Sequence, residues 1–177
     1  MRVISGLYKG KKLLGDNIDG TRPTMDRVKE SLFGSIQNKV KDSICLDLFA
    51  GSGSLGIEAL SNGAKECYFV DNNKVVIDVL KKNTINMNGV NIIFNEYNEA
   101  LKKFKNNNIK FDIIFLDPPY KFNLIEPSLK MIKAYDLLDD NGIIICEYET
   151  EEFNNIYSVI KEKRYGSKYI RILKKDL

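Results

Sequence analysis

The 177-residue sequence has no histidine, few cysteines, and no apolar run near the ~20 residues that a membrane-spanning helix needs. Without histidine, the commonest metal ligand is missing. The cysteines Cys45, Cys67 and Cys146 are odd in number, widely spaced and set among apolar residues, which indicates neither a metal site nor a disulfide framework. The first residues also lack the features of a secretory signal peptide. We therefore expect a cytoplasmic protein with buried, reduced thiols and no bound metal.

Positive charge is concentrated at the two ends of the chain. Residues 1–41 carry nine Lys and Arg against four acidic residues, and residues 161–177 carry seven against two, so each end has a net charge of +5. The middle, residues 42–160, has a net charge of −7, which leaves +3 overall. Basic ends can bind nucleic-acid phosphates, and a solvated lysine-rich surface is the simple alternative.

The first forty residues predict a hairpin followed by a helix. Residues 2–14 contain two short alternating runs broken by glycine, which favours a β-hairpin. Apolar residues then recur at helical spacing over residues 28–40, with Thr24 as the expected N-cap and Asp26 in the first turn.

From residue 43 onward, short apolar runs alternate with helical patterns. The expected buried parallel strands are residues 44–49, 66–70, 91–94, 111–116 and 142–146. The expected helices between them are residues 55–61, 74–87, 99–104 and 125–137. Residues 157–161 and 169–173 lie too close together for a crossover helix and predict an antiparallel hairpin at the sheet edge. The pattern as a whole predicts an α/β fold with a doubly wound, mostly parallel sheet of seven strands.

A glycine-rich segment, residues 47–56 (DLFAGSGSLG), lies where the first of these strands gives way to a helix. Glycines at this point let the backbone turn sharply and approach a ligand closely. Asp71 follows twenty residues after Gly51 and ends the next strand, where a carboxylate can bind a ribose diol. Both NAD(P) and S-adenosylmethionine fit this pattern. Asp47, just before the glycines, favours S-adenosylmethionine because its carboxylate can face a cationic aminoacyl group.

The segment Asp117-Pro118-Pro119-Tyr120 decides between the two cofactors. It ends an apolar strand with two prolines that fix the backbone, so the turn should lie beside the glycine loop at the carboxyl edge of the sheet. The Asp117 carboxylate and the Pro118 carbonyl can each accept one N–H of an exocyclic amine and stabilise the charge that develops on its nitrogen. The Tyr120 ring offers a surface on which an extruded base can stack. The sequence therefore predicts methylation of an aromatic amine, a reaction that needs no strong general base.

Residues 47–53 and 117–120 together resemble the Rossmann-like methyltransferases that act on exocyclic amines. Within that group the chain resembles the bacterial 16S ribosomal RNA guanine-N2 methyltransferases of the RsmD type. The similarity runs nearly end to end and includes residues 1–6 (MRVISG), 9–13 (KGKKL), 22–33 (RPTMDRVKESLF) and 162–166 (EKRYG). Ser5 stands where the family usually has glycine.

The resemblance implies S-adenosyl-L-methionine as cofactor and N2 of a guanine in 16S ribosomal RNA as the methylated atom. It implies cofactor contacts from Asp47, Phe49, Gly51, Ser52 and Gly53 to the methionine half, from Asp71 to the ribose and from Glu99 to the adenine amino group. The family more often has Asp or Asn at the position of Glu99. Residues 42–177 would form the methyltransferase domain and residues 1–41 an extension packed on it. We expect RNA-phosphate contacts from Arg2, Lys9, Lys11, Lys12, Arg22 and Arg27.

The expected partner is 16S ribosomal RNA within the small ribosomal subunit or an assembly intermediate, bound by a monomer. Adenine-N6 methylation of DNA or RNA uses the same Asp-Pro-Pro-Tyr chemistry and is the nearest alternative. Protein glutamine methylation typically has Asn at the position of Asp117. An NAD(P)-dependent oxidoreductase would explain the glycines but lacks an acid/base dyad, and a non-catalytic nucleic-acid-binding module would leave residues 117–120 without a role.

Overall fold

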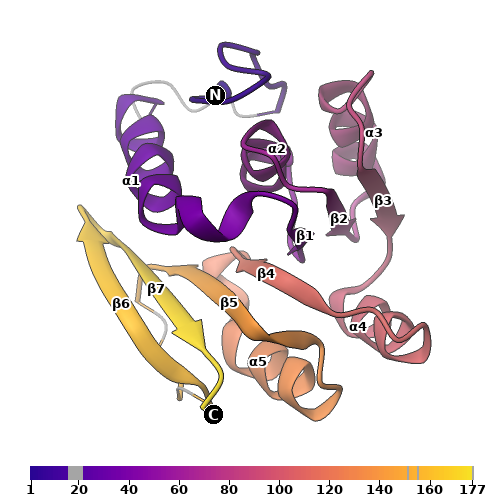
Figure 1. The fold of residues 1–177 in the computed structure, drawn as a ribbon, viewed down its shortest axis with the longest axis vertical. Helices are drawn as coiled ribbons and strands as arrows, with labels where there is room; N and C mark the ends of the chain where they lie inside the picture. The colour runs from indigo at the N-terminus through magenta and orange to yellow at the C-terminus, as the bar shows by residue number, and fades with distance from the viewer. Residues whose placement is uncertain (16–21, 151, 155, 177) are drawn as a thin grey trace.

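The computed structural model describes residues 1–15, 22–150, 152–154 and 156–176. Seven strands form one sheet in the order β3-β2-β1-β4-β5-β7-β6 (Figure 1). The strands are β1 (Ile44–Asp47), β2 (Glu66–Asp71), β3 (Val90–Phe94), β4 (Phe111–Leu116), β5 (Leu138–Tyr148), β6 (Ser158–Tyr165) and β7 (Lys168–Lys174). The first five pair in parallel, whereas β7 pairs antiparallel with both β5 and β6. The predicted doubly wound sheet with its antiparallel C-terminal hairpin is confirmed.

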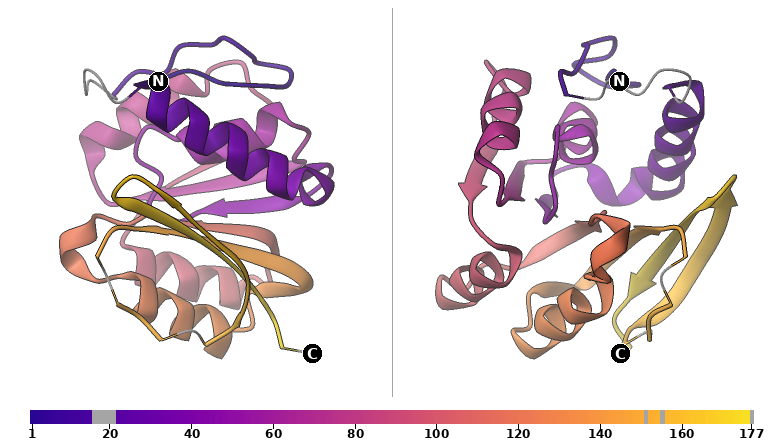
Figure 2. Two further views of the ribbon diagram at one scale, coloured as in Figure 1. Left: turned by 90° about the vertical axis from the view of Figure 1, so that its left-hand side faces the viewer. Right: turned by 180° about the vertical axis from the view of Figure 1, so that it is seen from behind.

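Helices cover both faces of the sheet. They are α1 (Arg22–Val40), α2 (Ser54–Ser61), α3 (Lys74–Asn83), α4 (Tyr97–Asn106) and α5 (Ile125–Ala134), with a 3₁₀ turn η1 at Tyr120–Phe122. Helices α1, α2 and α3 lie on one face and α4 and α5 on the other (Figure 2). Within the described residues, no helix is both long and apolar enough to cross a membrane.

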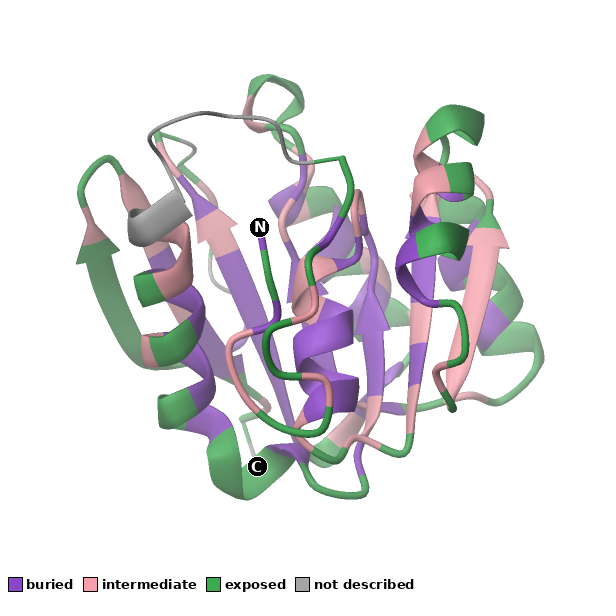
Figure 3. Cartoon of the chain, turned by 90° about the horizontal axis from the view of Figure 1, so that it is seen from above, coloured by how far each residue is buried: buried purple, intermediate pink, exposed green. Residues whose placement is uncertain are grey.

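The core consists of two apolar layers, one on each face of the sheet. On one face Phe33 of α1 packs against Phe115 of β4, with ring centroids 6.0 Å apart. On the other, the rings of Phe104 and Phe111 meet edge to face at 5.0 Å. Figure 3 shows buried positions on the central strands and on the inward side of the helices, and β6 as an exposed edge strand. Helix α1 packs into the same apolar core as the sheet. The domain boundary expected at residue 41 stays a prediction.

Several predicted element ends were wrong. Helix α1 begins at Arg22, so Thr24 lies inside the helix and cannot be its N-cap. A proline is well tolerated in the first helical turn, which explains why Pro23 does not delay the start. Helix α3 ends at Asn83, four residues before the predicted end. Strand β5 is longer than predicted at both ends, because Leu138 pairs with Phe111 of β4 and Tyr148 pairs with Tyr169 of β7.

The predicted N-terminal hairpin is present in a minimal form. One antiparallel bridge joins Arg2 to Lys12, and the Val3 amide donates to the Lys11 carbonyl at 2.9 Å. The hairpin lies on α2, where the Leu7 amide donates to the Ser61 carbonyl at 2.8 Å (Figure 1). At the other end of α2 the Ser54 hydroxyl lies 2.7 Å from the Met1 sulfur, which places the start of the chain near the carboxyl ends of the parallel strands.

Candidate active site

A cleft of about 1030 Å³ lies at the carboxyl edge of the parallel strands. Strand order reverses between β1 and β4, and ligands of open α/β sheets bind at such a switch point. Met1 and Met25 line the cleft from the N-terminal segment. Nine of the predicted site residues also line it: Asp47, Phe49, Gly51, Ser52, Asp71, Asp117, Pro118, Pro119 and Tyr120. The structure therefore brings together the two motifs, which are more than sixty residues apart in the sequence.

The glycine loop is shaped by close packing beneath it. Gly53 has φ of 87°, and a Cβ there would lie 2.4 Å from Cδ1 of Leu80. Gly56, inside α2, allows the helix to approach β2, because a Cβ would lie 2.4 Å from the ring of Phe69. Gly51 and Ser52 line the cleft, whereas Gly53 is buried and is not part of the cleft lining.

Asp47 ends β1 at the base of the cleft and is buried. Its carboxylate accepts a hydrogen bond from the Gly56 amide at 3.1 Å. Burial and the negative charge of Asp71 raise the pKa of Asp47 from 3.8 to about 7. A cationic group bound in the cleft would stabilise the ionised form, so this position suits the ammonium of an amino acid moiety.

Asp71 is held by two backbone amides. One carboxylate oxygen accepts from Gly51 and the other from Asn73, both at 3.0 Å. These bonds fix the carboxylate at the cleft wall and leave lone pairs on both oxygens for a ligand. The geometry fits the vicinal hydroxyls of a ribose.

The next wall comes from the junction between β3 and α4. Glu96 and Tyr97 line the cleft, and the Glu96 carboxylate accepts from the side-chain amide of Asn72 at 3.2 Å. The Tyr97 ring lies 5.4 Å from that of Phe49. Glu99 is an exposed residue of α4 outside the cleft lining. Since α4 begins at Tyr97 rather than at Glu99, the junction is occupied by Glu96, which the sequence reasoning missed.

Residues 117–120 form the opposite wall. Asp117 follows the last residue of β4, Pro118 is buried, and Tyr120 opens the turn η1. Burial, together with the negative charges of Glu147 and Asp47, raises the pKa of Asp117 well above its usual range, and Lys168 partly opposes this. Burial and Glu147 likewise raise the pKa of Tyr120, so its hydroxyl stays protonated.

Phe122 also lines the cleft, although the sequence reasoning did not single it out. Its side chain is 56% exposed, and the Lys121 ammonium lies 4.9 Å from the centroid of its ring. An exposed aromatic ring two residues after Tyr120 was the signal that could have identified it. The wall thus presents two aromatic rings, of which Phe122 is at the exposed rim.

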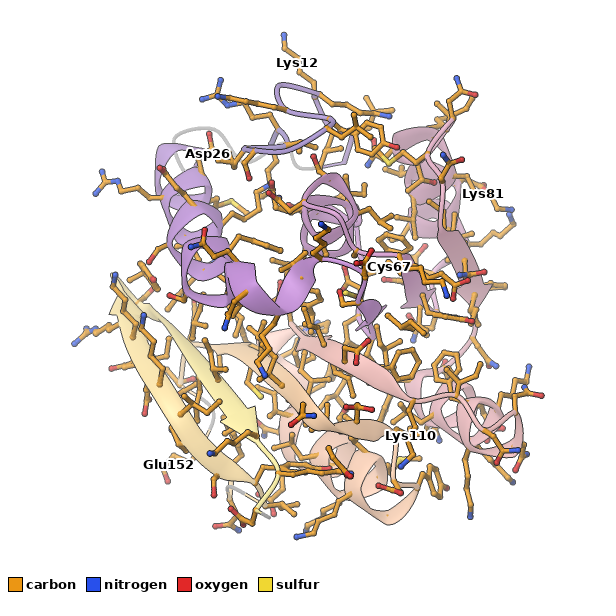
Figure 4. All side chains as sticks on the ribbon, in the orientation of Figure 1. Lys12, Asp26, Cys67, Lys81, Lys110 and Glu152 are labelled. Carbon is orange, nitrogen blue, oxygen red and sulfur yellow. The ribbon has the colours of Figure 1, made fainter. Side chains whose placement is uncertain are left out.

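The basic residues expected to bind RNA are separate from the cleft lining. Lys9, Lys12 and Arg27 are exposed, and Lys11 is half-buried. Arg2 is paired with Asp26 at 3.3 Å. Figure 4 shows Lys12 pointing outward from the hairpin. The side chain of Arg22 lies outside the described part of the structure.

The described residues contain no arrangement of three or more His, Cys, Asp or Glu side chains that could hold a metal ion. The three cysteines are buried and form no disulfide. Burial raises the pKa of the Cys45 thiol to about 12, so it remains protonated. The cleft is lined by carboxylates, backbone groups and aromatic rings.

The sheet order, the glycine loop after β1 and the Asp-Pro-Pro-Tyr turn after β4 define a Rossmann-like methyltransferase. The family model described as "Conserved hypothetical protein 95" matches residues 1–174, and the chain belongs to this family.

Relatives and solved structures agree with this assignment over nearly the whole chain. The chain is 40% identical over 172 residues to Ribosomal RNA small subunit methyltransferase D of Haemophilus influenzae, and the alignment covers 94% of this chain and 89% of the relative. It is 38% identical over 182 residues to "Putative rRNA methyltransferase YlbH" of Bacillus subtilis, with 99% of each covered. The solved structure of "Putative methyltransferase yhhF" from Escherichia coli superposes with a TM-score of 0.86 at 31% identity, covering 99% of this chain and 98% of that one.

Proposed function

We propose that this protein transfers a methyl group from S-adenosyl-L-methionine to the exocyclic N2 amine of a guanine in 16S ribosomal RNA. The observation that carries the proposal is the single cleft in which Asp47 and Asp71 lie on one side and residues 117–120 on the other. The relatives named as small-subunit ribosomal RNA methyltransferases support the choice of substrate. We further propose that the protein acts as a monomer in the cytoplasm, on the small subunit or an assembly intermediate.

The carboxylates around the glycine loop fit the cofactor. Asp47, buried and with a raised pKa, would hold the ammonium of the methionine half, and Asp71 would hold the ribose hydroxyls. Glu96, rather than Glu99, lies in the part of the cleft where the adenine would bind, next to the Phe49 and Tyr97 rings. When bound, S-adenosylmethionine supplies an electrophilic methyl group on a sulfonium sulfur.

The turn after β4 fits the target amine. The Asp117 carboxylate and the Pro118 carbonyl would each accept one N–H, which orients the nitrogen lone pair and stabilises its developing positive charge. Tyr120 would hold the base by stacking, and its neutral hydroxyl can donate to Glu147 at 3.5 Å. The proton leaves after the amine has become cationic, so no strong base is needed.

Mass spectrometry of ribosomal RNA nucleosides tests the proposed function. We expect cells that lack the gene to lose N2-methylguanosine from 16S ribosomal RNA, and a plasmid copy of the wild-type gene to restore it. A copy with Asp117→Ala is the matched control and should not restore it. Loss of N6-methyladenosine instead would establish the alternative reaction, and an unchanged nucleoside profile would overturn both.

Cofactor binding provides a direct prediction. In calorimetry, S-adenosylhomocysteine should bind much more tightly than NAD. Asp47 offers a buried carboxylate for the ammonium of its amino acid moiety, and the adenosine end of NAD has no such ammonium. Asp71→Ala should weaken S-adenosylhomocysteine binding by ~10-fold or more, through loss of charge-assisted hydrogen bonds worth about 1.5–3 kcal/mol. Asp78→Ala, an exposed change on α3, is the control. Tighter binding of NAD than of S-adenosylhomocysteine would contradict the assignment.

We propose that residues 1–41 form an extension that carries RNA contacts. Its hairpin packs on α2 through Leu7 and Ser61 and leaves Lys9 and Lys12 exposed. Each phosphate contact that is lost should reduce the slope of log K against log salt by about 0.9 on duplex RNA, and by about 0.7 on single strands.

The salt dependence of RNA binding tests this role. The triple variant Lys9→Gln/Lys11→Gln/Lys12→Gln should bind 16S ribosomal RNA more weakly and with a flatter salt dependence, while its affinity for S-adenosylhomocysteine stays the same. The triple variant Lys102→Gln/Lys103→Gln/Lys105→Gln removes the same charge from α4, on the opposite face of the sheet, and is the control. Equal slopes in the two variants would show that the hairpin lysines are only solvated surface.

A further inference from the structure

A second layer of charged residues lies behind the base-binding wall, on β5 and β7. Strands β4 and β5 are parallel and in register at Leu116 and Cys146. The next residues, Asp117 just after β4 and Glu147 still within β5, therefore lie side by side. Glu147 is close enough to exchange a hydrogen bond with the Asp117 carboxyl. Glu147 is not among the cleft-lining residues, so it can act on a substrate only through its neighbours.

Glu147 is held on two further sides. Its carboxylate lies 3.2 Å from the Lys168 ammonium of β7 and 3.5 Å from the Tyr120 hydroxyl. The side chains of Glu147 and Lys168 are only 13% and 28% exposed. One side chain thus contacts both of the groups, Asp117 and Tyr120, that meet the base.

The charges in this cluster do not balance when every group is ionised. Asp117, Glu147 and Asp47 are negative, and Lys168 from β7 is the cation that faces Asp117. Glu149 adds negative charge near Tyr120 and Lys168. Two adjacent carboxyls shielded from water cannot both ionise readily, and such pairs hold one proton between them.

We propose that Glu147 is a positioning residue that, anchored by Lys168, shares one proton with Asp117 and holds the Tyr120 hydroxyl. This inference rests on the proposed function of Asp117 as an acceptor for the amine. The negative charge of Glu147 favours the protonated form of Asp117, and the Lys168 ammonium opposes it, so the two neighbours set the pH at which Asp117 reaches the ionised form that accepts an N–H from the base. The bond to Tyr120 fixes the orientation of the ring, so acceptor and stacking surface are set by one group.

Opposite shifts of the pH profile are the expected signature. In single-turnover methylation, the rate should fall at low pH as Asp117 becomes protonated. Glu147→Gln removes a negative neighbour and should move this acid limb to lower pH by about one unit. At pH values below the acid limb of the wild type, Glu147→Gln should then be up to ~10-fold faster than the wild type. Lys168→Met removes the neighbouring cation and should move the limb to higher pH.

Glu149→Gln is the matched control, because it removes the same charge two residues away, just after the end of β5. Glu149 accepts from the Ser167 hydroxyl at 3.4 Å and does not touch Asp117. It should leave the acid limb nearly in place. A merely structural role for Glu147 would lower the rate at every pH without moving the limb, and shifts of the same sign in Glu147→Gln and Lys168→Met would also overturn the proposal.

Carboxyl titration by carbon-13 NMR tests the shared proton without any substrate. The Asp117 signal is assigned by its loss in Asp117→Asn, and it should titrate at lower pH in Glu147→Gln than in the wild type. If the wild-type protein methylates no ribosomal guanine and the titration still shifts, the proposed function fails while the carboxyl pair stands. If guanine is methylated and the Asp117 titration is the same in both proteins, the inference fails alone.

Discussion

Asp117→Ala should slow methyl transfer by ~10²–10³-fold, the usual effect of removing one preorganised transition-state contact. The reason is the place of Asp117 at the end of β4, where the rigid Pro118-Pro119 turn aims its carboxylate into the cleft. Affinity for S-adenosylhomocysteine should hardly change, since Asp47 and Asp71, the carboxylates proposed to hold the cofactor, come from other strands. Single-turnover assays on small subunits from cells that lack the gene would measure the chemical step apart from product release.

Variants of Tyr120 separate stacking from hydrogen bonding at the same wall. Tyr120→Phe keeps the ring and should retain most activity, whereas Tyr120→Ala loses a stacking surface worth about 1–3 kcal/mol per base. Equal loss of activity in the two variants would assign the main role to the hydroxyl and its contact with Glu147.

Near-wild-type turnover in Asp117→Ala would contradict the first prediction, because it would mean that another group activates the amine.

The second large effect is expected in stability. Lys29 of α1 and Glu58 of α2 form an ion pair at 3.2 Å, with only 4% and 1% of the side chains exposed. Glu58 also accepts from the amides of Ile4 and Ser5, and Lys29 donates to the Arg2 carbonyl at 2.6 Å. Removing one member of a buried pair leaves the other charge uncompensated, which typically costs about 3–5 kcal/mol.

Lys29→Met should therefore lower the free energy of unfolding by about 3–5 kcal/mol, measured by urea denaturation. Lys29→Met/Glu58→Gln should recover part of this loss, because the neutral amide oxygen still accepts an N–H and no lone charge stays buried. Lys74→Met breaks the exposed pair with Asp78 at 2.7 Å and should change stability very little. If the double variant is less stable than Lys29→Met alone, the uncompensated charge is not the cause.

This pair also matters for the cleft, because it holds the hairpin in place. Met1 lines the cleft, its carbonyl accepts from the Leu13 amide at 2.8 Å, and its sulfur lies 2.7 Å from the Ser54 hydroxyl. Loss of the hairpin contacts would remove Met1 from the lining of the proposed cofactor site. Stability and cofactor affinity should thus fall together in Lys29→Met.

Local sequence signals were sufficient for the sheet and for the two motifs. The buried strands show as apolar runs, because a parallel strand covered on both faces has no polar side. The glycine loop and residues 117–120 were recognisable because their backbone constraints are local: Gly53 needs a positive φ, and the prolines end β4. Their meeting in one cleft followed from the rule that parallel strands share a carboxyl edge.

Only the tertiary structure decided which charged residues are buried and with what partners. In the sequence, Lys29, Glu58, Glu147 and Lys168 look like ordinary surface residues, and nothing in their spacing distinguishes them from their neighbours. Glu96 likewise replaced Glu99 at the cleft because α4 begins two residues before the predicted start. Periodicity reports which face of an element is apolar. The burial and pairing of a charge depend instead on elements far apart in the chain, here α1 with α2 and β5 with β7.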